Sequence, residues 1–370
     1  MKIDPVRVPS HPLASAISPG IYPYLGGSVD PGLLRSVVSA CGGGVVSGRH
    51  GAKLAARTPG VLVDPAAYGG PAATEPGPLF DYDEWLTRQQ AAGVPLILTD
   101  TPRIRNDDRS ALGKALERWA AIDDPTLVVL PLEPWWLREG LPHLIEEVRA
   151  AGRPVAIVLL HRYNGLDTAR AVAGLLTFIA EVEPLPVILL RCDISAVGAV
   201  AHRAFAGFVG WSANTRHGPL PMRRPDRAEG DDSPSVFVPA LHDYVKTSKL
   251  PALARDRRTD TLRCGDPAWR GGSLLEIAEL SETDMRASRL LAGRHNMAST
   301  EQVARRILSA AEPRDAWRDA CRAGAEAGAA LAERGVSLPP SRWLRQWLDI
   351  GPHPRASAEP APVGLLLQEP

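Results

Sequence analysis

The sequence predicts an α/β protein, a (β/α)₈ TIM barrel followed by a C-terminal helical appendage. Eight short runs rich in Val, Ile and Leu recur before residue 242, and they do not alternate with polar residues. Strands that are buried on both faces have this composition, and such strands form parallel sheets. Helical patterns lie between the runs, and this repeated alternation of strand and helix is typical of the closed barrel. An open, doubly wound sheet is the alternative architecture.

The expected strands and helices follow one another in a regular order. The strands are expected at residues 44–49, 61–64, 95–100, 126–133, 154–161, 186–193, 207–212 and 235–241. Helices are expected at 83–93 and 140–152, which both end in glycine with a proline two residues later. Glycine tolerates the positive φ of a helix C-terminus, and proline at the first position of a strand loses no ladder bond. A third helix is expected at 167–183, where Asp167 suits the N-cap.

The composition shifts along the chain predict three regions. Residues 1–270 are expected to form the barrel, with the charged, proline-rich stretch 219–234 as a mobile loop. Residues 271–350 have mostly helical patterns and are expected to pack on the barrel as an appendage. Residues 351–370 are rich in Pro and Ala and are expected to be a disordered tail.

Charge and cysteine content indicate which partners and which cellular compartment to expect. The chain has 42 Lys and Arg against 42 Asp and Glu, so its formal net charge is zero and gives no general attraction to nucleic acid or acidic membranes. Its four cysteines are far apart and form no CxxC pair, which is typical of a reducing cytosol. No segment has the pattern of a signal peptide or a bilayer span. We therefore expect a cytoplasmic protein with no membrane partner.

Polar side chains follow the expected strands, and functional residues of such barrels gather at the C-terminal ends of the strands. Asp64 ends one strand, and the catalytic candidates Asp100, Glu133 and Asp193 end three others. Carboxylates that lie close together shift each other's pKa, so that one acts as acid or base while another stays charged. The residues expected to bind substrate are Trp135, His161, Arg191, Asn214, Arg216 and His217.

Each binding candidate also has a structural interpretation. Trp135 suits stacking on a base, but tryptophans on a barrel rim also serve packing. Arg216 suits a phosphate, because its guanidinium offers two parallel donors. Arg216 and His217 could instead pair with an acidic stretch, Glu229, Asp231 and Asp232.

Three segments resemble motifs of the tRNA-guanine transglycosylase family, in the family's order and over most of the chain. LILTDTPRIR, residues 96–105, resembles the LTDSGGFQ-type strand end, with Asp100 on the substrate-binding Asp. FVGWSANTRHG, residues 208–218, resembles the FDCVxPTRNxRxG segment, with Thr215 and Arg216 on its Thr-Arg pair. Cys264 and His295 stand at the first and last positions of the family's zinc motif.

The departures from the family pattern fall on its chemical groups. The family's nucleophilic Asp falls on Gly210, and the Gln that helps to hold the base falls on Leu159. The two middle zinc ligands fall on Asp266 and Trp269, and tryptophan cannot ligate zinc. The resemblance therefore implies no cofactor other than a degenerate zinc site, with Cys264, Asp266 and His295 as its ligands. The alternative is an appendage that folds by apolar packing alone.

The resemblance implies a pentosyltransferase, in which a carboxylate attacks the sugar C1′ and displaces the base. Asp100 would bind the base or act as acid or base, and Asp193 or Glu133 would be a relocated nucleophile. The implied partners are tRNA, DNA or a free nucleobase, with a homodimer as the assembly. Two alternatives stay open: a non-catalytic barrel that serves as a binding or scaffold subunit, and an unrelated barrel enzyme.

Overall fold

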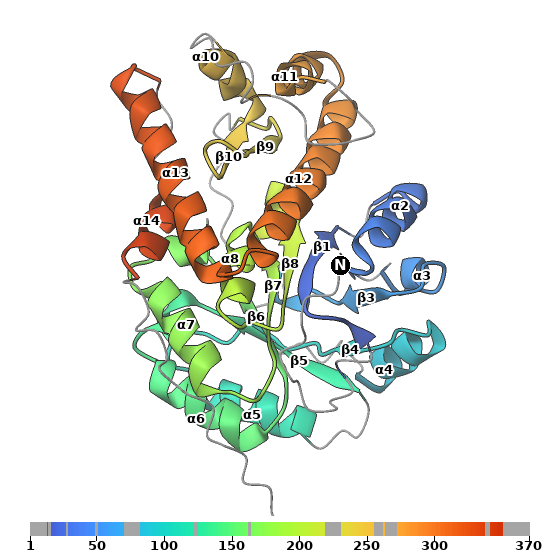
Figure 1. Ribbon diagram of the computed structural model, residues 1–370. Coiled ribbons are helices and arrows are strands. Elements are labelled where there is room, and N and C mark those ends of the chain that lie inside the picture. Colours follow the sequence, from blue (N-terminus) through green and yellow to red (C-terminus); the bar gives the residue numbers. More distant parts are fainter. Residues whose placement is uncertain are drawn as a thin grey trace, which may run out of the picture.

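The computed structural model describes residues 13, 16–26, 29–48, 51–69, 82–120, 125–161, 164–218, 231–254, 262, 272–336 and 341–350. Eight parallel strands form a nearly closed barrel with helices around it, as predicted (Figure 1). The strands are β1 (Gly20–Leu25), β2 (Gly44–Ser47), β3 (Val61–Asp64), β4 (Ile97–Leu98), β5 (Thr126–Leu132), β6 (Val155–Leu159), β7 (Val187–Cys192) and β8 (Ala206–Gly210). Their order is β3-β2-β1-β8-β7-β6-β5-β4, and β3 also contacts β4.

The strands of the structure differ from the expected ones at two places. β1, with the sequence GIYPYL, is a barrel strand that was not expected. Two tyrosines and a proline interrupt the run of Val, Ile and Leu that marks the other strands. The run expected as the eighth strand instead forms β9 (Ser235–Val238), which pairs antiparallel with β10 (Asp243–Lys246) outside the barrel. β9 is buried because α12 (Met285–Leu308) packs against it, and this burial produces the same apolar composition as a barrel strand.

Helices of the barrel follow its strands on the outside. They are α2 (Pro31–Cys41), α3 (Gly51–Ala55), α4 (Tyr82–Ala91), α5 (Arg109–Ala120), α6 (Leu141–Ala151), α7 (Ala171–Glu181) and α8 (Ser195–Ala201). The short α9 (Ala213–Arg216) instead lies over the end of β8. Gly93 and Gly152 follow α4 and α6 with φ of 65° and 64°, as the glycine pattern predicts. The N-cap expected at Asp167 is wrong: Asp167 ends the 3-10 turn η4 (Gly165–Asp167), and α7 begins after Arg170.

The alternate residues of the strands divide into two apolar layers. Leu127 and Val129 of β5 belong to one buried cluster together with Leu98 and Val158 of neighbouring strands. Val128 and Leu130 of the same strand belong to a second cluster, with residues of the surrounding helices such as Leu144 and Val148 of α6. This alternation buries β5 on both faces, as expected for a parallel barrel strand.

The appendage contains α10 (Leu250–Ala254), α11 (Leu274–Thr283), α12, α13 (Pro313–Glu333) and α14 (Arg342–Leu348). The long helices α12 and α13 stand on either side of the β9–β10 hairpin above the barrel (Figure 1). Trp343 and Trp347 of α14 pack on Trp317 of α13, with ring centroids 6.1 Å and 5.3 Å apart. Among the described residues, no helix combines the length and apolarity needed to cross a bilayer.

Candidate functional site

The C-terminal end of the barrel carries a buried carboxylate, Asp64, at the last position of β3. Its Oδ2 accepts hydrogen bonds from the hydroxyls of Tyr24 (2.6 Å) and Tyr68 (2.5 Å), and its Oδ1 accepts one from the backbone amide of Ala66 (2.8 Å). Tyr24 comes from β1, and Tyr68 comes from the 3-10 turn η1 (Ala67–Gly69). Both Asp64 oxygens are therefore occupied, and three donors hold the carboxylate in place.

Asp100 lies two residues beyond β4, and its environment differs from that of Asp64. Burial, together with the negative charge of Asp64, raises the pKa of Asp100 to about 7, against a smaller opposing effect of Arg118. Its Oδ1 is buried and accepts no hydrogen bond within the described part of the chain. Asp100 is thus a carboxyl group that can hold or release a proton near neutral pH and that has an oxygen available for a ligand.

Arg191 of β7 lies over the tyrosines that hold Asp64. Its guanidinium is 5.8 Å from the ring centroid of Tyr24 and 5.9 Å from that of Tyr68, and its Nη2 donates to the Asn214 carbonyl at 2.6 Å. Burial lowers the pKa of Arg191, but the tyrosines and Asp64 outweigh this effect and raise it. Its backbone has φ of 54°, and its buried Nε meets no acceptor among the described residues. The arginine is held firmly and keeps one donor unused.

Two histidines come side by side at the end of β6. Leu160 pairs with Gly218 in a parallel bridge, and the His161 amide donates to the Gly218 carbonyl at 3.0 Å, which brings His217 next to His161. Burial lowers the pKa of His217 to about 3, with further effects of Arg216, Arg191 and His161. Burial also lowers the pKa of His161. Both imidazoles are therefore neutral at pH 7, and each can donate or accept a hydrogen bond.

Arg216 and Asp193 lie deeper, between the barrel and the appendage. The Arg216 guanidinium lies 3.7 Å from the ring centroid of Tyr244 in β10 and donates to the Ser235 hydroxyl. Burial lowers the pKa of Arg216, although Tyr244 and Asp193 oppose this effect. Arg216 therefore joins the barrel to the hairpin. The alternative, a pairing of Arg216 with Asp231 or Asp232, does not occur among the described residues, and Glu229 lies outside them.

The Asp193 carboxylate is hydrogen-bonded on both oxygens. Its Oδ2 accepts from Asn164 Nδ2 at 2.6 Å, and its Oδ1 accepts from the Ser195 amide at 2.9 Å. Burial raises its pKa. Asp193 is close enough to Arg216 to affect its pKa, so a chain of charge interactions runs from Asp100 through Asp64, Arg191 and His217 to Arg216 and Asp193.

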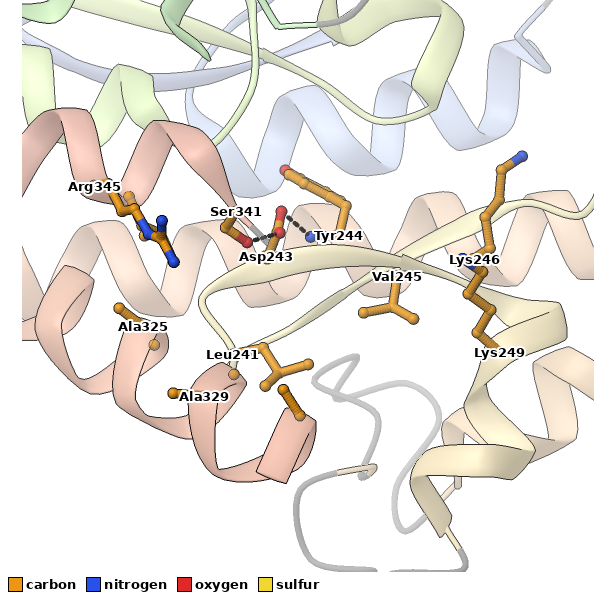
Figure 2. Close-up of a pocket in the computed structure, with 14 residues that line it drawn as sticks. Leu241, Asp243, Tyr244, Val245, Lys246, Lys249, Ala325, Ala329, Ser341 and Arg345 are labelled. Atoms are coloured by element: carbon orange, nitrogen blue, oxygen red, sulfur yellow. Dashed lines mark hydrogen bonds between the residues drawn. The ribbon is translucent and has the colours of Figure 1, made fainter. Parts of the chain in front are cut away.

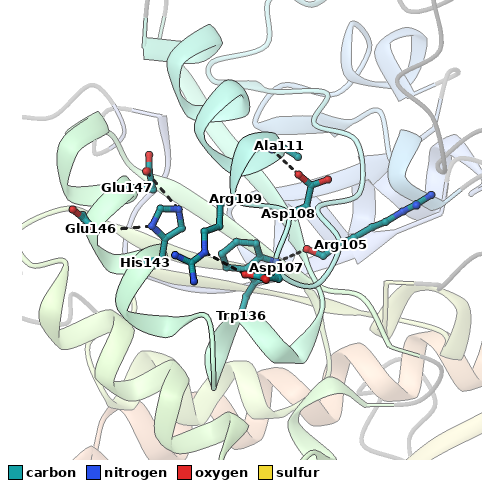
Figure 3. Close-up of polar contacts among 9 residues, drawn as sticks. All are labelled: Arg105, Asp107, Asp108, Arg109, Ala111, Trp136, His143, Glu146 and Glu147. Carbon is teal, nitrogen blue, oxygen red and sulfur yellow. Dashed lines mark hydrogen bonds and ion pairs between the residues drawn. The ribbon is translucent and has the colours of Figure 1, made fainter.

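Glu133 and Trp135 follow β5 and have partners of their own. Glu133 Oε1 accepts hydrogen bonds from Nε (2.8 Å) and Nη2 of Arg103. The half-buried Trp135 packs edge to face on Trp136, with the ring centroids 5.1 Å apart. Trp136 in turn donates to the Arg105 carbonyl at 2.9 Å (Figure 3). The segment after Asp100 thus wraps around the end of β5.

Of the expected zinc ligands, only His295 lies among the described residues. His295 is fully buried in α12, and its Nε2 lies 2.6 Å from the Phe237 carbonyl of β9. Cys264 and Asp266 lie outside the described residues. Within the described ranges, no group of three or more His, Cys, Asp and Glu side chains is arranged to hold a metal ion. His295 joins α12 to the hairpin, and the metal set stays a prediction.

Gly210, the position that aligns with the family's nucleophile, lies under the backbone of α9. A Cβ atom on Gly210 would lie 2.2 Å from the Thr215 carbonyl carbon, far inside contact distance. No side chain fits there without moving α9. A nucleophile at this point of the barrel is therefore excluded by packing as well as by sequence.

Sequence reasoning missed the tyrosines that organise the site. Tyr24 lies on β1, the strand that was not expected. Tyr68 lies four residues after Asp64, in the 3-10 turn η1, and a tyrosine this close to a strand-end acid was the available signal. The structure brings together His161, Arg191, Asn214, Arg216 and His217, and Asp193 lies near Arg216. Asp100 is linked to this group through Asp64, whose charge affects both Asp100 and Arg191. Glu133 and Trp135 lie in the separate contacts after β5.

The comparisons with known proteins leave the family open. The chain matches no protein-family model, and no curated protein matches it. The resemblance to tRNA-guanine transglycosylases therefore depends on the motifs alone. What is established is the fold: a nearly closed parallel (β/α)₈ barrel with a helical appendage above it.

Proposed function

We propose that this protein is a diverged tRNA-guanine transglycosylase-like protein that binds or acts on a nucleobase or nucleic acid at the C-terminal face of the barrel, with base exchange at an N-glycosidic bond as its reaction. The observation that carries the proposal is Asp100, a carboxyl group with a pKa of about 7 and an unused buried oxygen at the end of β4. The same residue falls on the substrate-binding Asp of the resembled motif.

A carboxyl group of this kind suits the edge of a base. The edges of purines carry ring N–H and amino donors beside ring nitrogen and carbonyl acceptors. An ionised Asp100 accepts from the donors, and a protonated Asp100 donates to the acceptors. Because its pKa is near neutral, Asp100 can also return a proton to a departing base nitrogen.

The neighbouring strand ends suit the sugar and phosphate of the same nucleotide. Arg191 has an unused Nε donor, and a guanidinium forms strong charge-assisted bonds to phosphate oxygens. The neutral imidazoles of His161 and His217 lie beside it and can donate to hydroxyl or phosphate oxygens. Asn214 holds Arg191 through its backbone carbonyl.

Base exchange requires a nucleophile to hold the sugar. A carboxylate oxygen would attack C1′ while the C1′–N bond breaks and the leaving base nitrogen takes a proton from Asp100. The incoming base would then give its N–H proton to Asp100 and attack C1′, which releases the carboxylate. Gly210 cannot supply that carboxylate. We propose Asp193 or Glu133 for this role, since hydrogen bonds from Asn164 and Arg103 respectively hold these groups in position.

A non-catalytic barrel is the second candidate, and Gly210 favours it. The side chain that performs the attack in the resembled family has no room here. Asp193 and Glu133 are each engaged by neighbouring side chains. On this proposal the barrel binds a base, or a nucleic acid that carries one, and serves as a binding or scaffold subunit.

Incorporation of labelled guanine or 7-deazaguanine into total tRNA and total DNA tests the first proposal. The matched variants are Asp100→Asn, which keeps the shape of the side chain, and Asp349→Asn, an exposed control at the C-cap of α14. Incorporation that Asp100→Asn loses and Asp349→Asn keeps supports base exchange. If neither polymer gains label with the unmodified protein, base exchange is overturned and the binding proposal remains.

A further inference from the structure

The appendage contains a cavity that lies apart from the barrel mouth. It measures about 350 Å³ and lies between the β9–β10 hairpin and the helices α13 and α14 (Figure 2). This volume is at the lower end of the range for small-molecule sites, roughly 300–1,000 Å³. The proposed function uses no residue of this cavity except through Tyr244, whose ring contacts Arg216.

The middle of the cavity is apolar and has room for a chain. α13 contributes only glycine and alanine to the lining, and Leu241, Val245 and Leu344 contribute larger apolar side chains. The α13 residues that line the cavity are Gly324, Ala325, Gly328, Ala329 and Ala332. A Cβ on Gly328 would meet nothing within 4 Å, so this side of the helix faces open space.

The ends of the cavity are positively charged. Arg345 of α14 lies at one end, and Lys246 and Lys249 lie at the other, with Leu241 and Val245 between them (Figure 2). The Lys246 ammonium donates to the backbone carbonyls of Asp231 (3.0 Å) and Ser233 (2.6 Å). Lys249 and Arg345 form no ion pair with any described residue.

Among the described residues of the lining, Asp243 has the one carboxyl group, and it forms no ion pair with Lys249 or Arg345. Asp243 accepts hydrogen bonds from the Ser341 hydroxyl, from the Tyr244 amide at 2.7 Å and from Trp343 Nε1 at 3.4 Å. Its oxygens are therefore occupied within the protein. A ligand that enters the cavity meets an apolar middle and unpaired cations at both ends.

We propose that the cavity binds a medium-chain dicarboxylate, with its apolar chain along α13 and its two carboxylates near Arg345 and Lys249. Burial of each methylene supplies affinity, and the two charged ends set the length and the class of ligand. A neutral chain would leave both cations unpaired, and a fatty acid would leave one. This site is independent of the proposed nucleobase site.

Calorimetric titration of the full-length protein with decanedioate tests the proposal, with decanoate as the ligand that lacks one charge. We expect saturable binding with one ligand per chain, and we expect decanoate to bind about two- to fivefold more weakly, the range for one partly exposed ion pair. Hexanedioate has four fewer methylenes and should bind at least tenfold more weakly. No binding of decanedioate, or equal binding of decanedioate and decanoate, overturns the proposal.

Variants assign the binding to this cavity. Gly328→Leu fills the open space and should weaken decanedioate binding at least tenfold, whereas Ala323→Leu on the exposed side of the same helix should not. Arg345→Ala should weaken decanedioate about two- to fivefold and remove its advantage over decanoate, whereas Lys114→Ala on α5 should do neither. Unchanged binding in both Gly328→Leu and Arg345→Ala overturns the assignment, and the Arg345 variant keeps the test valid if Gly328→Leu does not fold.

Discussion

Gly210 and Thr215 approach so closely that the Gly210 Cα faces the backbone of α9 directly. A Cβ on Gly210 would lie 2.2 Å from the Thr215 carbonyl carbon and 2.4 Å from the Arg216 amide nitrogen. The close approach positions α9 over the end of β8, and from there Arg216 reaches Tyr244 and Asn214 holds Arg191. Gly210 is therefore the residue that allows α9 to take this position in the site.

Gly210→Ala is expected to destabilise the protein by about 1–3 kcal/mol or more, because the obstructing atoms belong to the backbone and cannot rotate away. Gly328→Ala is the matched control, since its Cβ enters open space in a helix, where alanine is favoured over glycine by up to about 1 kcal/mol. Denaturant unfolding of both variants checks this. Equal stability of the two variants would contradict the close approach.

Tyr68→Phe is expected to cost about 2 kcal/mol of unfolding free energy, because it removes a donor from the buried Asp64 carboxylate. Tyr22→Phe removes a neutral bond to the Ser18 carbonyl, 2.7 Å long, and should cost about 1 kcal/mol. Chemical denaturation of the two variants at pH 7 measures the difference. A smaller loss for Tyr68→Phe than for Tyr22→Phe would show that Asp64 does not depend on its tyrosines.

Asp100 is expected to make the protein less stable as pH rises from about 4 to about 7. Burial raises its pKa from the ordinary 3.8 to about 7 in the fold, so the folded chain keeps a proton that the unfolded chain has released in this range. Asp100→Asn removes this effect. The stability of the unmodified protein relative to the variant should fall by a few kcal/mol across the range, since each pKa unit corresponds to about 1.4 kcal/mol. A relative stability that is independent of pH would show that Asp100 titrates normally.

His242 is expected to make the protein less stable as pH falls from about 6.5 to about 3, the opposite of the effect of Asp100. Burial lowers its pKa from 6.5 to about 3, so between these values the unfolded chain binds a proton that the folded chain does not, and stability falls as pH falls. His242→Asn suits the backbone φ of 51°, because asparagine tolerates this region. Unfolding curves between pH 3 and pH 7 should show a shallower acid loss in the variant; parallel curves would contradict the prediction.

The barrel could be predicted because its strands are buried on both faces, and this burial gives each strand a run of apolar residues that is visible in a single sequence. The pattern failed where burial has another cause. β9 has the composition of a barrel strand because α12 covers it, and β1 lacks that composition because Tyr22, Pro23 and Tyr24 interrupt it. Periodicity reports burial, but not which element does the burying.

The site was predictable as far as strand ends determine it. The positions of Asp100, His161 and Arg191 at strand ends could be predicted because the barrel fold determines where its strands end. Their protonation was not predictable, since the pKa of Asp100 depends on Asp64 and on burial that only the folded chain defines. Tyr24 and Tyr68 both donate to Asp64. Tyr24 lies 40 residues before Asp64, and a contact over that separation cannot be recognised from the local sequence pattern.

Equilibrium binding of 7-deazaguanine to the unmodified protein and to Asp100→Asn tests the central claim most directly, because both the catalytic and the non-catalytic proposals require it. We expect saturable binding to the unmodified protein that Asp100→Asn weakens by about tenfold or more, as the loss of one charge-assisted hydrogen bond requires. Asp349→Asn should bind as the unmodified protein does. Equal binding by Asp100→Asn, or no binding of 7-deazaguanine to the unmodified protein, would contradict a nucleobase site at Asp100.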